Sequence, residues 1–282
     1  MIKLTELLRT RGFSESKSTK IVRHLDSRVD MRMLRRRGHF EFYQRTQPKD
    51  VFNCEQIVSF LGDENRRAIF CGVYSVGGKR EVTADEPLSI PIGYPHPELL
   101  DGPGVIYDLS KVSGFEDLED RVVIDWGDAA LSWAQWFRDR EVVEVLPTGY
   151  VMDWPGYQAV RLPLADLRAI VASPSANREW VRRLSSVAGV YCILHANTGE
   201  LYVGSASGKE GIWGRWRVYA DTAHGGNVRL RARCENVAGY EDDLVFSILQ
   251  VLPIGSSKDE VIAAETCMKE KLGARAFGLC AN

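Results

Sequence analysis

The sequence predicts an α+β protein with two domains, and three observations support this. The chain of 282 residues, 45% hydrophobic and 26% charged, is long enough for two hydrophobic cores. Apolar residues recur at helical spacing over residues 2–37, whereas strand-like apolar runs dominate from about residue 51. A segment rich in Ser, Pro and Asn at 172–180 marks a connector. We expect a basic helical arm over 1–50, a mixed domain over 51–175 and a smaller domain over 186–282.

The first half of the chain is expected to mix helices and strands. Apolar residues follow helical spacing over 4–8 and again over 21–25, with a break at Gly12 and the serines that follow it. Runs rich in Val, Ile, Tyr and Phe predict strands at 66–78, 120–127 and 140–147. The segments 54–62 and 128–139 are expected to be helical.

Composition excludes several classes of protein. No run approaches the roughly 20 apolar residues that a membrane span needs. The N-terminus lacks the apolar core and cleavage site of a secretory signal. The six cysteines have no CxxC spacing, which argues against a zinc site or a disulfide framework. We therefore expect a cytoplasmic protein with reduced thiols and no membrane partner.

Positive charge is concentrated at the N-terminal end. The net charge of the chain is −2, yet the first fifty residues hold thirteen Lys and Arg against six Asp and Glu. A basic end on an otherwise neutral chain is typical of proteins that contact phosphate there, and Arg35, Arg36 and Arg37 are the first candidates. A solvated helical face would show the same pattern.

The C-terminal domain begins with a predicted β-hairpin over 188–208. Two alternating apolar strands flank Asn197-Thr198-Gly199, residues suited to a tight turn. Each strand carries a tyrosine close to a glycine, Gly189 with Tyr191 and Tyr202 with Gly204.

Helices and a strand are predicted to follow the hairpin. A helix at 210–222 contains Arg215 and Tyr219, a strand follows at 244–253, and a last helix at 258–273 carries Glu265 on an apolar face. An acid in such a place is costly to bury unpaired, which favours a cation beside it.

This order of motifs resembles the GIY-YIG nuclease family. The resemblance covers about residues 186–282 and implies a small domain with a central antiparallel sheet flanked by helices. It implies catalytic roles for Tyr191, Tyr202, Arg215 and Tyr219, and it makes Glu265 the single metal-binding carboxylate, with Mg²⁺ or Mn²⁺ as the cofactor. The family pattern has an asparagine after the last helix. Here Cys280 stands near that position, and Asn282 is the alternative.

Phosphodiester hydrolysis explains why these residue types are needed. A divalent cation at Glu265 would stabilise the leaving oxygen, and Arg215 would bind the non-bridging oxygens. Close to an arginine and a metal, the phenolate of Tyr191 is favoured, so Tyr191 is expected to accept the proton of water. Tyr202 would orient the water or a phosphate oxygen. Gly189 and Gly204 would let the backbone approach its neighbours closely.

Other residues are weaker candidates for nucleic-acid contacts. Lys269 and Lys271 follow Glu265 on the same helix and are candidates for phosphate contact. Arginines at alternate positions of 227–235 suggest a strand face that contacts the DNA backbone or is simply solvated. The candidates for backbone contact in this domain are Arg217, Arg229 and Arg231.

The domain over 51–175 is expected to recognise the target. The run at 66–78 faintly resembles the central strands of PUA-like domains, a fold with readers of modified or flipped bases. A flipped base needs aromatic stacking, and Trp126 is the first candidate for such a pocket.

These features together indicate a metal-dependent DNA endonuclease. Its expected role is restriction of foreign DNA, including base-modified phage DNA. The alternatives are a nuclease for unmodified DNA in sequence-specific restriction, repair or mobile-element transfer, and a catalytically inactive DNA-binding module. The expected partner is double-stranded DNA, with a homodimer as the unit that cuts both strands.

Overall fold

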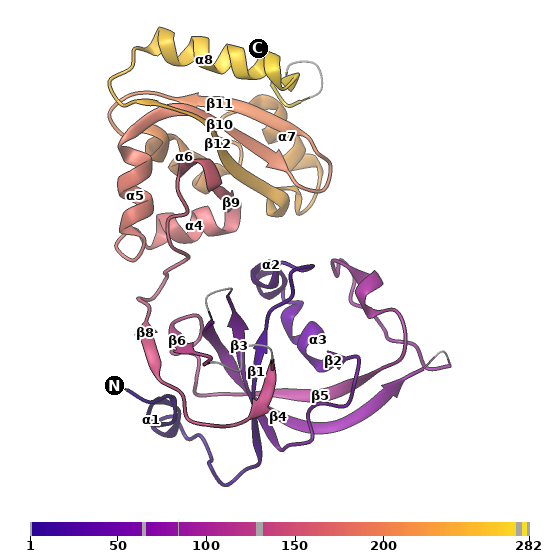
Figure 1. Ribbon diagram of the computed structural model, residues 1–282. Coiled ribbons are helices and arrows are strands. Elements are labelled where there is room, and N and C mark those ends of the chain that lie inside the picture. The colour runs from indigo at the N-terminus through magenta and orange to yellow at the C-terminus, as the bar shows by residue number, and fades with distance from the viewer. Residues whose placement is uncertain (1, 64–65, 84, 128–131, 275–277, 281–282) are drawn as a thin grey trace. The chain divides into compact units, whose positions relative to one another are not determined.

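The computed structural model confirms the α+β class. It describes residues 2–63, 66–83, 85–127, 132–274 and 278–280. The chain divides into two compact units, Met1–Leu146 and Pro147–Asn282, each with its own sheet (Figure 1). The division lies before the predicted connector at 172–180, because the segment from Pro147 onward contributes a strand and two helices to the second unit. Among the described residues, no helix has both the length and the apolar character to cross a bilayer.

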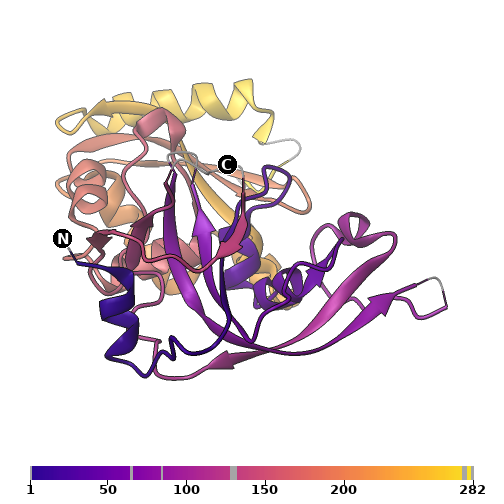
Figure 2. The same ribbon diagram turned by 60° about the horizontal axis from the view of Figure 1, so that its bottom comes forward.

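Unit 1 is built on a curled sheet of mixed direction, with eight strands among the described residues. Six of them lie in the order β2-β5-β4-β3-β1-β7, β6 pairs with β4, and β8 pairs with β6. β1 and β3 are parallel, and the other pairs are antiparallel. In Figures 1 and 2, β4 and β5 extend as a long two-stranded ribbon. The strands are β1 (Thr19–His24), β2 (Thr46–Gln47), β3 (Gln56–Gly62), β4 (Arg67–Val82), β5 (Gly104–Val112), β6 (Val122–Asp125), β7 (Ala134–Trp136) and β8 (Val142–Val145).

The strands predicted at 66–78, 120–127 and 140–147 are confirmed as β4, β6 and β8, but three predicted helical segments are wrong. The segments 54–62 and 21–25 contribute to β3 and β1, which pair in parallel near the middle of the sheet. Both strands are buried on both faces, so their apolar residues do not alternate with polar ones. Such a run cannot be distinguished from a helix by periodicity alone. The helix predicted at 128–139 is also wrong where it is described, because Ala134–Trp136 form β7.

Residues 1–50 are therefore not a helical arm. Three short helices flank β1 in this segment: α1 (Leu4–Arg9), α2 (Met31–Arg36) and α3 (Phe40–Arg45). Leu4 and Leu8 of α1 are fully buried in the core beneath the sheet, and Phe40 of α3 is fully buried in a second cluster. The basic segment is part of the first unit rather than an appendage to it.

Unit 2 has a four-stranded antiparallel sheet in the order β11-β10-β12-β9. The predicted hairpin, the helix after it, the third strand and the last helix are all found. α8 covers one face of the sheet, whereas α4, α5 and α6 cover the other (Figure 1). The elements are β9 (Arg161–Pro163), α4 (Leu164–Ala172), α5 (Arg178–Ser185), β10 (Val187–His195), β11 (Leu201–Ala206), α6 (Gly211–Thr222), α7 (Val228–Asn236), β12 (Leu244–Pro253) and α8 (Lys258–Lys271).

Candidate active site

The hairpin of β10 and β11 places its two tyrosines around one glycine. Tyr191 lies directly opposite Gly204 in the antiparallel register. A Cβ atom at Gly204 would lie 2.6 Å from the Tyr191 hydroxyl oxygen and 2.7 Å from Cε1 of Tyr202. Any side chain at this position would therefore displace both phenol rings.

Gly189 has a different role, because it permits a close approach of two strands. A β-bulge interrupts the pairing of β10 with β12 between Val190 and Tyr191, just after this glycine. A Cβ atom at Gly189 would collide with the carbonyl oxygen of Gln250 on β12. The bulge changes the direction of the side chains that follow it, so Gly189 helps to aim Tyr191.

Replacement of Gly204 by alanine is expected to destabilise unit 2 by about 1–3 kcal/mol, the usual cost of overpacking a dense core. Gly255→Ala is the matched control, because a Cβ atom there has nothing within 4 Å, and its effect should stay within about 1 kcal/mol. Denaturant unfolding of both variants measures the difference. Equal stability of the two variants would show that the phenols move aside without cost.

Four residues from the hairpin and α6 form a cluster, here called the tyrosine–arginine cluster: Tyr191, Tyr202, Arg215 and Tyr219. Arg215 and Tyr219 lie one turn apart on α6, so both project from one face of the helix. The Tyr191 hydroxyl lies 3.2 Å from that of Tyr219, and the Arg215 guanidinium donates to both, at 3.3 and 3.4 Å. The Tyr202 ring centroid lies 6.5 Å from that of Tyr191 and 6.4 Å from that of Tyr219.

Burial decides the protonation state of this cluster. Tyr191 and Tyr219 are fully buried, and burial raises the pKa of both phenols well above the ordinary value. Partial burial opposes the charge of Arg215, but the neighbouring phenols outweigh it and raise the pKa of the guanidinium. The cluster at neutral pH is thus a charged arginine beside two neutral phenols. This state disfavours the phenolate that the sequence interpretation assigned to Tyr191.

Tyr202 is the accessible tyrosine of the four-residue cluster. It lies on β11, the edge strand of the sheet, and is only half-buried. Its ring packs against the core on the α6 side and also against the core on the α8 side. Tyr202 therefore contacts the cores on both faces of the sheet.

Glu265 forms a second polar group with Ser205 and Lys269 on the α8 side of the hairpin. Successive side chains of a strand point to opposite faces, so Ser205 faces α8 while Gly204 faces α6. The Ser205 hydroxyl donates to the Glu265 carboxylate, and the Lys269 ammonium lies 2.7 Å from its Oε1 atom. The side chains of Glu265 and Lys269 are 19% and 11% exposed.

The oxygen atoms of this group suit a magnesium ion better than a zinc ion. Among the described residues, no set of three or more His, Cys, Asp and Glu side chains is placed to hold a metal. Mg²⁺ commonly needs only one or two carboxylates, because water and phosphate oxygens complete its shell. Glu265 with the Ser205 hydroxyl fits that requirement, although Lys269 already neutralises the carboxylate. A cation at Glu265 would have to compete with this ammonium.

Cys280 contacts the backbone of the edge strand β11. The backbone N–H of Val203 donates to the Cys280 sulfur at 3.3 Å, and the N–H of Leu279 donates to the carbonyl of Leu201 at 2.7 Å. The segment thus lies along the free edge of β11, the strand that carries Tyr202. Asn282, the alternative for the family's asparagine, lies outside the described residues.

The remaining basic candidates of unit 2 lie on helices. Residues 228–236 form α7, so the predicted strand face is wrong, and Arg229 and Arg231 point in different directions around the helix. Arg229 donates to the carbonyl of Gly278 at 3.2 Å. Arg217, Arg231 and Lys271 are exposed, and Arg217 pairs with Glu210 at 3.2 Å.

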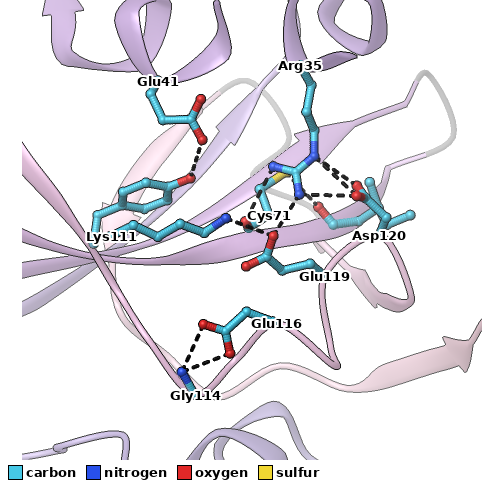
Figure 3. Close-up of polar contacts among 10 residues, drawn as sticks. Arg35, Glu41, Cys71, Lys111, Gly114, Glu116, Glu119 and Asp120 are labelled. Carbon is cyan, nitrogen blue, oxygen red and sulfur yellow. Dashed lines mark hydrogen bonds and ion pairs between the residues drawn. The ribbon is translucent and has the colours of Figure 1, made fainter. Parts of the chain in front are cut away.

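In unit 1 the structure does not support Arg35 as a DNA contact. Figure 3 shows its guanidinium between Glu119 and Asp120, with both ion pairs at 3.0 Å. It also donates to the carbonyl of Cys71, and its side chain is only 16% exposed. Arg35 therefore holds α2 to the sheet. Arg36 is exposed and Arg37 is half-buried.

The prediction that Trp126 lines a base pocket is wrong. Its side chain is fully buried, 6.3 Å from Phe60 between ring centroids. Its indole N–H donates to the carbonyl of Ser132 at 3.1 Å, and the guanidinium of Arg140 covers the ring at 5.6 Å. No face of the indole is left for a ligand, so Trp126 is a core residue.

Two residues of the site were missed in the sequence. Ser205 follows Gly204 directly, and strand alternation could have placed it opposite the tyrosines, toward the last helix. Gly225 lies in the turn after α6, where a Cβ atom would approach the Tyr219 ring to 2.5 Å. Nothing local in the sequence indicates that contact, because the turn folds back over the helix.

The matches to known proteins are solved structures that cover about a third of this chain. No protein-family model and no curated protein matches the chain. One matching solved structure is the catalytic domain of homing endonuclease I-TevI, 24% identical, covering 33% of this chain and 95% of that one with a TM-score of 0.26. Another is a mutant of the catalytic domain of intron endonuclease I-TevI, 21% identical, covering 34% and 94% with a TM-score of 0.27. Scores of this size do not establish a shared fold.

Proposed function

We propose that unit 2 is a metal-dependent endonuclease of the GIY-YIG type that hydrolyses phosphodiester bonds in double-stranded DNA. The observation that carries this proposal is the tyrosine–arginine cluster. A guanidinium is held charged by hydrogen bonds to two buried neutral phenols. A fixed guanidinium matches the non-bridging oxygens of a phosphate and stabilises the charge that builds on them.

The burial of the tyrosines assigns different roles to them. Tyr191 and Tyr219 remain protonated and position Arg215 through their hydroxyl groups. Tyr202 is half-buried at the strand edge, so it can reach both solvent and phosphate. We therefore assign the contact with the attacking water to Tyr202 and a positioning role to Tyr191.

Glu265 and Ser205 would hold the divalent cation, Mg²⁺ or Mn²⁺. When bound, the ion supplies Lewis-acid stabilisation of the charge on the phosphate and on the leaving oxygen. Glu265 is kept in place by the Ser205 hydroxyl. Lys269 neutralises the carboxylate in the absence of another cation and is available for phosphate once displaced.

Unit 1 would select the target. Its basic N-terminal segment suits phosphate contact, which positions a protein on DNA without reading its sequence. We assign the protein to restriction of foreign DNA, including base-modified phage DNA. Sequence-specific restriction, repair or mobile-element cleavage of unmodified DNA is the alternative. A single site of this kind cuts one strand, so a homodimer on DNA would produce double-strand breaks.

The test of this function is nicking of supercoiled plasmid and of phage DNA, both unmodified and carrying hydroxymethylcytosine. Cleavage is expected with Mg²⁺ or Mn²⁺ and should stop when EDTA is added. Preference for the modified DNA would support the restriction role, and equal cleavage would favour the alternative. Binding of DNA without cleavage under any metal would make the chain a binding module.

The two tyrosines of the hairpin should differ in their effect on cleavage. Tyr202→Phe is expected to lower the cleavage rate by about 10²-fold, the contribution of a group that acts on the proton of water. Tyr191→Phe removes one hydrogen bond to Arg215 and should cost about tenfold. Single-turnover cleavage at saturating DNA separates them. The reverse order would return the proton-accepting role to Tyr191.

A further inference from the structure

We propose that a cavity in unit 1 receives a nucleobase turned out of the DNA duplex. The proposal rests on the proposed function only in taking DNA as the substrate. The cavity measures about 580 Å³ and lies where the end of β1, α3, the loop 99–104 and Trp133 meet. This volume falls in the usual range of small-molecule sites, about 300–1,000 Å³.

Three aromatic residues line this cavity, and His24, the buried one of the three, is 3% exposed. The His24 ring centroid lies 5.8 Å from that of Tyr43 and 5.7 Å from that of Trp133. Burial lowers the pKa of His24 to about 4, so its imidazole is a neutral ring at physiological pH. Tyr43 and Trp133 are half-buried, which leaves part of each ring open to the cavity. Such a wall suits a flat heterocycle, since every base offers a π-face to aromatic side chains.

A fixed carboxylate supplies the polar side of the cavity. Asp26 lines the cavity and its side chain is 12% exposed. Arg28 donates to both of its oxygens, at 2.9 and 2.7 Å, and the Tyr43 hydroxyl donates at 3.5 Å. The hydrogen bonds from Arg28 lower the pKa of Asp26, so the group accepts hydrogen bonds only. The backbone N–H of Arg28 also donates to Oδ1 of Asp26, at 3.0 Å. An N–H group on the edge of a base would therefore take the place on Oδ2 that the distant Tyr43 hydroxyl occupies.

Charged side chains of both signs line the same opening. The Arg28 side chain is 66% exposed while it holds Asp26, Asp101 also lines the cavity, and Arg23 in its wall is buried. A base outside the helix brings its phosphates to the rim, where an exposed guanidinium can pair with them. The aromatic wall, the carboxylate acceptor and the exposed Arg28 guanidinium together favour a nucleotide over an apolar ligand.

The test measures binding of the full chain without metal, so that no cleavage occurs. Two duplexes of one sequence are compared, one fully paired and one with 2-aminopurine in a mismatch. Extrusion costs less for a mispaired base, so the mismatched duplex should bind at least about tenfold tighter. The fluorescence of 2-aminopurine reports whether that base leaves the stack.

Trp133→Ala should remove this preference, whereas Trp136→Ala, three residues further along in β7, is the matched control. Trp136 is 56% exposed, lies beneath the Lys20 ammonium and is not among the residues that line the cavity. Asp26→Asn keeps the shape of the side chain and should also reduce the preference. This variant tests the pocket independently if Trp133→Ala does not fold.

Three results would overturn the proposal. The first is equal affinity for both duplexes, and the second is a preference that survives both Trp133→Ala and Asp26→Asn. The third is that free mononucleotides, at the same mass concentration as the DNA, displace the mismatched duplex from the protein. That result would make the cavity a small-molecule site. Cleavage is scored separately. A preference for the mismatched duplex without cleavage would support the base pocket and contradict the nuclease function. Cleavage without such a preference would support the nuclease function and contradict the base pocket.

Discussion

Arg215→Ala is expected to slow DNA cleavage by about 10²–10³-fold at saturating DNA, the usual loss when a group that stabilises transition-state charge is removed. The guanidinium has hydrogen bonds to two buried phenols and lies 4.9 Å from the centre of the Tyr219 ring. Its position is therefore fixed before DNA binds, and little reorganisation is needed when charge develops on the phosphate.

Arg215→Lys separates charge from geometry. Lysine keeps the charge but cannot form the planar, two-pronged contact that arginine makes with phosphate and with both phenols. We expect it to recover less than a tenth of the lost rate, as measured by single-turnover cleavage. Full recovery would mean that Arg215 acts only as a point charge.

Arg217→Ala is the matched control on the same helix. Its side chain is 46% exposed and pairs with Glu210 at the surface. Loss of such a contact is expected to change the rate at saturating DNA by less than about fivefold, although affinity for DNA can fall with a dependence on salt. A loss equal to that of Arg215→Ala would show that helix α6 as a whole, and not the phenol-bound guanidinium, binds the phosphate.

The features of the site that depend on local sequence were predictable. The hairpin follows from alternation and a turn, and the one-turn spacing of Arg215 and Tyr219 follows from the helix. The protonation state of Tyr191 was not predictable. It depends on burial by α6 residues and Gly204, which lie far from it along the chain.

Unit 1 was harder to predict because its contacts are distant in sequence. Arg35 pairs with Glu119 and Asp120, more than eighty residues away, so its charge alone suggested a free cation. The same reason applies to Trp126, which was the first candidate for a base pocket, because Phe60, which covers it together with Arg140, lies far from it in sequence. The aromatic cavity also draws His24 and Trp133 from segments that were predicted to be helices.

Glu265→Gln is expected to lower cleavage by about 10³-fold, because several kcal/mol of stabilisation from the cation would be lost. The amide keeps the size of the side chain and can still accept from Ser205. Lys269, only 11% exposed, loses this carboxylate, so some loss of thermal stability is expected and the rates are compared at a temperature where both proteins are folded. Mn²⁺ at high concentration should not restore more than a small fraction of the rate. Cleavage at the wild-type rate would place the metal site elsewhere.

Lys269→Met then tests whether lysine and metal compete for the same carboxylate. The pair is 2.7 Å apart and poorly exposed, so a metal ion that binds Glu265 has to compete with the Lys269 ammonium for the same carboxylate oxygen. Methionine fills similar space without charge, and the Mg²⁺ concentration for half-maximal cleavage should fall several-fold. An unchanged requirement for Mg²⁺ would mean that Lys269 stays bound to Glu265 throughout the reaction. A reduced maximal rate at saturating Mg²⁺ would instead assign Lys269 to the phosphate, so one titration distinguishes the two roles.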